Sequence, residues 1–170
     1  MASKSKLVIS DITLFGVLAA LTFGMKVVMS GLPNIEPVSL MVMLFAVLFG
    51  KKALYPIYVY VVLEFLVYGI NLWSICYLYI WLILWLAAYL LRNMKEPLGW
   101  ALLSGVFGLL FGVFCGVLDL ILGGWSYAVS KWVSGLMFDV THCLGNFVIA
   151  LLLFKPLRTL LEKLYRKMRQ

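Results

Sequence analysis

The sequence predicts an all-α integral membrane protein, in which residues 1–170 form a single domain folded as a compact bundle of six transmembrane helices. Hydrophobic residues make up 65% of the chain and charged residues only 12%, with a mean hydropathy of +1.07. A soluble domain of this length cannot bury so much apolar surface. The apolar residues also fall into separate runs, and a chain of 170 residues has room for about six spans of ~20 residues.

The six expected helices follow from where the apolar runs begin and end. They cover residues 12–30, 38–49, 53–70, 73–91, 98–122 and 128–154. Ser10 and Asp11 precede the first run as expected N-cap residues. Prolines and glycines interrupt the chain at residues 32–37, 50 and 123–124, and Asn71 is expected to form a turn.

Basic residues predict the orientation of the bundle. One set of loops and ends carries nearly all of them: Lys4, Lys6, Lys51, Lys52, Arg92, Lys95 and the C-terminal tail. The opposite loops hold Glu36, with Lys131 near the start of the sixth span. The positive-inside rule therefore predicts that both termini are cytoplasmic, and the net charge of +7 serves topology rather than nucleic-acid binding. Residues 156–170 are expected to form a basic amphipathic helix that anchors to lipid or binds a partner.

A polar stripe runs along the sixth expected helix. At about 100° per residue, its members fall within roughly 80° of one another. They are Lys131, Gly135, Asp139, His142 and Asn146. Polar groups at membrane depth usually face a protein interior or a wet cavity. The stripe is therefore either a buried network that ties helices together or one wall of a ligand site, and we favour the wall.

Other ionisable and aromatic residues collect in the same, outer half of the expected bundle. Tyr60, Glu64, Tyr68 and Asn71 share one face of the third span, and Lys26 and Asp119 lie toward the outer ends of their spans. Residues of opposite charge in this region can pair, as Lys26 or Lys131 with an acidic side chain. Trp73, Tyr77 and Trp125 form either an interfacial belt or an aromatic wall for a flat ligand.

Small residues recur at four-residue spacing in two expected helices, a pattern that lets helices approach closely. Gly16, Ala20 and Gly24 form the first stripe. Ser104, Gly108, Gly112 and Gly116 form the second. We expect the second stripe to serve internal packing. For the first stripe, internal packing and docking onto another subunit remain open.

Several motifs of catalysis are missing from the sequence. It contains no phosphate-binding loop of the G-x-x-x-x-G-K-[ST] type, no H-E-x-x-H and no G-x-S-x-G. Its single histidine stands without a nucleophile or a metal cluster, and Cys76, Cys115 and Cys143 lack the spacing of metal ligands. We therefore predict neither an enzyme nor a protein with a bound metal or cofactor.

The order of these features resembles the substrate-binding (S) component of an energy-coupling factor (ECF) transporter. The segments that carry the resemblance are residues 32–39, 48–53 and 138–147. In that family a small-x-x-x-small motif on the first helix docks onto the coupling subunit. Gly16 and Ala20 match its spacing, with glycine in place of the usual first alanine, and Ala20 with Gly24 would serve equally well. The first loop, with Asn34 and Glu36, would cover the pocket.

The resemblance implies a bacterial cell-membrane protein that captures a vitamin outside and then topples in the bilayer. Its partners would be a membrane coupling subunit and two ATPase subunits. Cobalamin or a related vitamin is the first guess, and folate, pantothenate, riboflavin or a queuosine precursor stay open. The alternative is an autonomous small carrier or channel, or a structural subunit of a membrane complex. The candidate substrate-binding residues are Lys26, Asn34, Glu36, Glu64, Tyr68, Asn71, Trp73, Tyr77, Asp119, Trp125, Lys131, Asp139 and His142.

Overall fold

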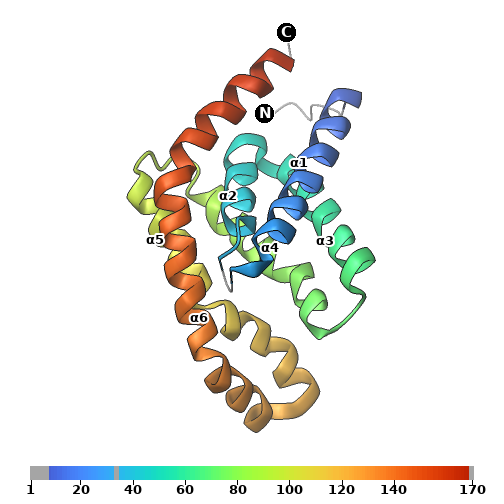
Figure 1. Cartoon of the computed structure of the whole chain (residues 1–170), viewed down its shortest axis with the longest axis vertical. Helices are drawn as coiled ribbons and strands as arrows, with labels where there is room; N and C mark the ends of the chain where they lie inside the picture. Colours follow the sequence, from blue (N-terminus) through green and yellow to red (C-terminus); the bar gives the residue numbers. More distant parts are fainter. Residues whose placement is uncertain (1–7, 33–34, 169–170) are drawn as a thin grey trace.

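The computed structural model describes residues 8–32 and 35–168, and every regular element in these ranges is a helix (Figure 1). The α-helices are α1 (Ile9–Val28), α2 (Val38–Phe49), α3 (Leu54–Tyr68), α4 (Leu72–Leu90), α5 (Pro97–Leu109) and α6 (Phe111–Met168). Two short 3₁₀ helices, η1 (Met29–Gly31) and η2 (Gly50–Ala53), follow α1 and α2. The start of α1 and the end of α6 lie at the same end of the bundle (Figure 1).

Long apolar helices make the chain compatible with a multi-pass membrane protein. Four continuous helical stretches of the described residues are long and apolar enough to cross a bilayer: Ile9–Gly31, Val38–Tyr68, Leu72–Leu90 and Pro97–Met168. Two of them are divided by glycines in the left-handed region, Gly50 at φ 58° and Gly124 at φ 75°. These are the positions at which the sequence predicted turns, because glycine adopts positive φ without steric cost.

The prediction of the first helix cap is wrong. Helix α1 begins at Ile9 after Val8, which makes no side-chain cap. Asp11 instead lies inside the first turn, where it is buried and forms a 2.8 Å ion pair with the ammonium group of Lys52. The observed partner is 41 residues away in the chain, so local sequence patterns could not reveal it.

The prediction of one uninterrupted helix over residues 98–122 is also wrong. Helix α5 ends at Leu109 and α6 begins at Phe111. At this junction the backbone N–H of Gly112 donates a 3.0 Å hydrogen bond to the carboxylate of Asp139. The carboxylate satisfies one of the backbone donors that a new helix start leaves open. The remaining α-helices, α2, α3 and α4, begin and end within two residues of the predicted positions.

Helix α2 forms the centre of the bundle. Every residue from Val38 to Ala46 is buried. The helix packs against α1, α3, α4 and α6. A helix that is apolar on all sides is stable only when other helices surround it. Its central place explains how the other helices can keep long apolar faces turned outward.

The two stripes of small residues have different environments. A side chain at Gly108 would meet the backbone of His142 at 2.8 Å, and Ser104 is fully buried, so close packing is confirmed for these two members of the second stripe. The prediction is wrong for Gly116, because a Cβ atom added there would meet nothing within 4 Å. In the first stripe, a Cβ atom added at Gly16 or Gly24 would also meet nothing within 4 Å. The first stripe therefore does not serve close packing inside the described chain.

The C-terminal tail continues helix α6 rather than forming a separate helix. Pro156 lies inside α6. Beyond it, Leu157, Leu161 and Tyr165 pack against the core, and the Tyr165 ring meets Phe49 edge-on at 5.1 Å. One face of the tail is thus used within the protein. Its expected role at the lipid surface stays a prediction.

Candidate functional site

Two neighbouring cavities lie toward the end of the bundle opposite the start of α1 and the end of α6. The small cavity has a volume of about 290 Å³ and the large cavity about 590 Å³. Trp73, Phe111 and Phe138 line both, so these three rings form a common wall. The small cavity is also lined by Lys26, Met29, Ser30, Leu32, Ile35, Glu36, Tyr68, Tyr77 and His142.

An ion pair sits at the edge of the small cavity. The ammonium group of Lys26 lies 2.8 Å from the carboxylate of Glu64, which is buried on α3. The same ammonium donates to the Tyr77 hydroxyl at 3.4 Å and lies over the rings of Tyr68 and Tyr77, 5.4 and 5.1 Å from their centroids. The predicted pairing of opposite charges is therefore confirmed for Lys26 and Glu64. The positive charge is already neutralised by the protein.

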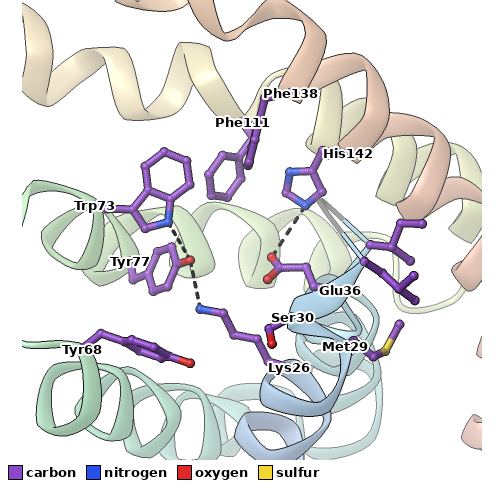
Figure 2. Close-up of a pocket in the computed structure, with 12 residues that line it drawn as sticks. Lys26, Met29, Ser30, Glu36, Tyr68, Trp73, Tyr77, Phe111, Phe138 and His142 are labelled. Carbon is purple, nitrogen blue, oxygen red and sulfur yellow. Dashed lines mark hydrogen bonds and ion pairs between the residues drawn. The ribbon is translucent and has the colours of Figure 1, made fainter.

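The aromatic wall is fixed by ring contacts and by a hydrogen bond. The indole N–H of Trp73 donates to the Tyr77 hydroxyl at 2.9 Å (Figure 2). The Trp73 ring meets Phe138 edge-on at 5.5 Å and lies tilted against Phe111 at 5.6 Å. Such edge and tilted arrangements stabilise aromatic clusters beyond simple burial. The wall thus offers a rigid apolar surface whose Trp73 side is open to a ligand.

His142 is the most unusual residue in the small cavity. Its side chain is only 1% exposed, and its ring lies 4.9 Å from Phe111 and 5.6 Å from Phe138. Neither ring nitrogen has a hydrogen-bond partner among the described residues. An unsatisfied buried polar group costs roughly 1–3 kcal/mol, so native proteins rarely keep one without a reason. A ligand in the cavity would supply the missing partner.

Glu36 faces His142 from the segment that joins η1 to α2. Its carboxylate lies 3.7 Å from the imidazole, too far for a hydrogen bond (Figure 2). The side chain is 16% exposed. Burial raises the pKa of Glu36 to about 7, with Glu64 adding to the rise and Lys26 opposing it. Glu36 therefore changes charge near neutral pH.

The large cavity holds the other half of the predicted site. Its polar lining comes mainly from Asn71, Asp119, Lys131 and Asp139. Asn71 also caps α4 through a reciprocal pair of hydrogen bonds with Ser74. One oxygen of Asp139 accepts from Gly112, and its other oxygen has no partner among the described residues. Two of these four groups thus serve helix starts.

The predicted stripe on α6 is divided among three places. Lys131, Gly135 and Asp139 line the large cavity, and His142 lines the small one. Asn146 is buried and donates to the Ser39 hydroxyl at 3.1 Å, which ties α6 to α2. The helix-packing interpretation is therefore confirmed for Asn146, and a ligand-site wall stays a prediction for the members that line cavities.

The remaining candidates are also placed by the structure. Trp125 is 73% exposed and lines a shallow apolar groove instead of either cavity. Glu64 lines neither cavity but pairs with Lys26, which lines the small one. Asn34 falls outside the described residues. Sequence reasoning missed Phe111 and Phe138, which line both cavities. Phenylalanine in an apolar span carries no signal that separates a cavity wall from core or lipid contact.

No family model matches the chain, and neither the curated proteins nor the solved structures contain a match.

Proposed function

We propose that this protein is the substrate-capture subunit of a membrane importer, of the kind that S components provide in ECF transporters. The observation that carries the proposal is the buried His142 side chain, which lines a walled cavity and has no hydrogen-bond partner among the described residues. Concave sites with an apolar wall and a few convergent polar groups are the usual form of small-molecule sites. The resemblance of residues 32–39, 48–53 and 138–147 to S components supports the same function.

The proposal includes a topology of six crossings with both termini in the cytoplasm. Breaks at Gly50 and Gly124 divide the two longest apolar stretches, which supports six crossings. Lys51 and Lys52 stand at one of the chain reversals, and Lys52 pairs with Asp11 near the start of α1. With the basic end inside, the two cavities face outward. The substrate then enters from outside.

The face of α1 that carries Gly16, Ala20 and Gly24 is the proposed docking surface for a membrane coupling subunit. It packs closely against nothing in the described chain, and its neighbours Val17 and Leu21 are exposed apolar residues. Small residues on such a face allow a partner helix to approach closely. Two ATPase subunits would supply the energy, since the sequence holds no phosphate-binding loop of its own.

The size of the small cavity favours a small substrate. Its volume of about 290 Å³ lies at the lower end of the range for ligand pockets, which is ~300–1,000 Å³. A molecule of one or two rings suits this space. We therefore propose a substrate of that size rather than cobalamin, whose corrin macrocycle is far larger.

Uptake measurements test the proposal against an autonomous carrier. Cells or vesicles that hold the protein with the coupling subunit and both ATPases should accumulate the substrate, and removal of the ATPases should abolish accumulation. Uptake that persists without the ATPases would contradict the proposal and favour a carrier or channel.

Docking is tested separately with the double substitution Gly16→Leu and Ala20→Leu. We expect this variant to bind substrate normally but to lose co-purification with the coupling subunit. Gly116→Leu is the matched control, because a Cβ atom added at Gly116 also meets nothing within 4 Å, but Gly116 lies on α6. If the control loses the partner and the double variant keeps it, the docking surface lies elsewhere.

A further inference from the structure

The positive charge at the small cavity is already paired within the protein. Among the described residues, Lys26 is the one lysine or arginine that lines the cavity, and its ammonium is held by Glu64 and by the rings of Tyr68 and Tyr77. A carboxylate or phosphate on the ligand would have to compete with Glu64 at 2.8 Å. Because that pair is largely buried, separating it is costly. The cavity is therefore poorly suited to an anionic ligand.

Glu36 presents the opposite situation. Figure 2 shows its carboxylate pointing into the space bounded by Trp73, Phe111 and His142. In the described part of the chain, no side chain donates a hydrogen bond to it, and the His142 imidazole, 3.7 Å away, is an ion-pair partner only when it is protonated. A buried carboxylate is stable only when donors or a positive charge satisfy it. The unmet need in this cavity is thus for donors.

His142 has an unmet need of its own, for one hydrogen-bond donor and one acceptor. A neutral imidazole has one donor and one acceptor nitrogen, and both nitrogens of His142 are without partners among the described residues. Together, the carboxylate and the imidazole can receive two N–H groups on neighbouring positions of one flat molecule. The aromatic wall of Trp73, Phe111 and Phe138 suits the faces or edges of the same molecule.

We propose that the substrate of the small cavity is a planar aromatic nitrogen compound of one or two rings, without an anionic group, which donates N–H groups to Glu36 and packs against Trp73. This inference rests on the proposed function of the same cavity. It narrows the substrate to amino-substituted or amidine-like heterocycles. It excludes ring compounds that depend on a carboxylate or phosphate for recognition.

Three probes of nearly the same shape test the charge preference directly. Benzamidine carries a cationic pair of N–H donors, benzamide a neutral amide, and benzoate a negative charge. Their affinities for the purified full-length protein can be measured by calorimetry and by quenching of tryptophan fluorescence. We expect benzamidine to bind about tenfold more tightly than benzamide, as suits a charge-assisted hydrogen bond. Benzoate should bind most weakly.

The variant Glu36→Gln tests whether Glu36 causes the preference for a cationic ligand. The variant should reduce benzamidine affinity about tenfold and leave benzamide affinity nearly unchanged, because glutamine keeps the shape but loses the charge. Glu96→Gln is the matched control, since it makes the same change at an exposed carboxylate that lines neither cavity. The control should bind all three probes as the wild type does.

Several results would overturn the inference. They are tightest binding of benzoate, binding of none of the three probes, and an unchanged ratio of benzamidine to benzamide in Glu36→Gln. These failures are distinct from failure of the proposed function. An anionic substrate imported with the ATPases would end this inference and leave the proposed function standing. Uptake without the ATPases would contradict the proposed function and leave the inferred ligand preference of the cavity standing.

Discussion

The two cavities share a wall but differ in what their polar groups already do. In the large cavity, Asn71 caps α4, and one oxygen of Asp139 holds the start of α6 through Gly112 while its other oxygen has no partner among the described residues. In the small cavity, both ring nitrogens of His142 are without a hydrogen-bond partner among the described residues, and the Glu36 carboxylate lies 3.7 Å from that ring. The comparison teaches that a polar group buried among apolar helices does not by itself mark a ligand site. The stronger mark is hydrogen-bonding capacity that the fold leaves unused.

The largest expected effect comes from removing one half of the ion pair beside the small cavity. Lys26→Met leaves the buried carboxylate of Glu64 without its cation and should destabilise the protein by ~3 kcal/mol. Lys131→Met, on the exposed rim of the large cavity, should change stability little. Thermal unfolding of both variants in the same detergent measures the difference.

A double variant shows whether loss of the ion pair, rather than a packing defect, causes the instability. Lys26→Met combined with Glu64→Gln removes both charges and should recover most of the lost stability, because the uncompensated buried charge is gone. If the double variant is as unstable as Lys26→Met alone, the ion pair is not the cause.

His142→Phe should separate binding from stability. The substitution replaces an unsatisfied polar ring, packed between Phe111 and Phe138, with an apolar ring of similar size. We expect substrate affinity to fall about tenfold or more, with an unfolding temperature equal to or above that of the wild type. A clear loss of stability with normal binding would show that His142 serves packing and that the comparison between the cavities is wrong.

The charge state of Glu36 predicts a pH dependence that the large cavity should not share. With its pKa raised to about 7, Glu36 is mostly neutral at pH 6 and mostly ionised at pH 8. Benzamidine keeps its charge over this range, so its affinity should rise about tenfold from pH 6 to pH 8.

Lys26 of α1, Glu64 of α3, Tyr77 of α4 and His142 of α6 also line or adjoin the small cavity. Glu36→Gln is therefore the necessary control for that pH dependence. A flat profile in this variant assigns the effect to Glu36, and an unchanged slope would assign it to another of these groups.

The smallest effect concerns the large cavity. Asp139→Ala removes the acceptor for the Gly112 N–H and should cost ~1 kcal/mol of stability, as the loss of a helix cap does. Asp139→Asn keeps an acceptor oxygen and should cost less. Affinity for ligands of the small cavity should hardly change in either variant, as calorimetry would show. A large loss of affinity would join Asp139 to the small cavity's site.

The sequence predicted those features of the fold that depend on local chemistry. Glycines at 50 and 124 predicted turns because each needs a positive φ. The sequence placed Lys26 and Glu64 in the same half of the bundle and predicted that a lysine there can pair with an acidic side chain, as these two residues do in the structure. Topology limited the choice to a few charged residues at that depth, and tertiary packing selected the pair.

Features that depend on distant partners could not be predicted. After the break at Leu110, the backbone N–H of Gly112 donates to the carboxylate of Asp139, which is 27 residues away in the chain. Asp11 looked like a helix cap because its partner Lys52 belongs to another helix junction. Phe111 and Phe138 were missed because an aromatic ring in an apolar span fits core, lipid or cavity equally well. The stripe on α6 was found, but its division between two cavities follows from tertiary packing alone.

Native mass spectrometry of the intact protein, purified gently from cells, tests the central claim most directly. We expect a bound non-lipid molecule of one or two rings in the wild type and in Lys131→Met, and its loss in His142→Phe. Retention of that molecule in His142→Phe, together with its loss in Lys131→Met, would place the ligand site in the large cavity and contradict the account.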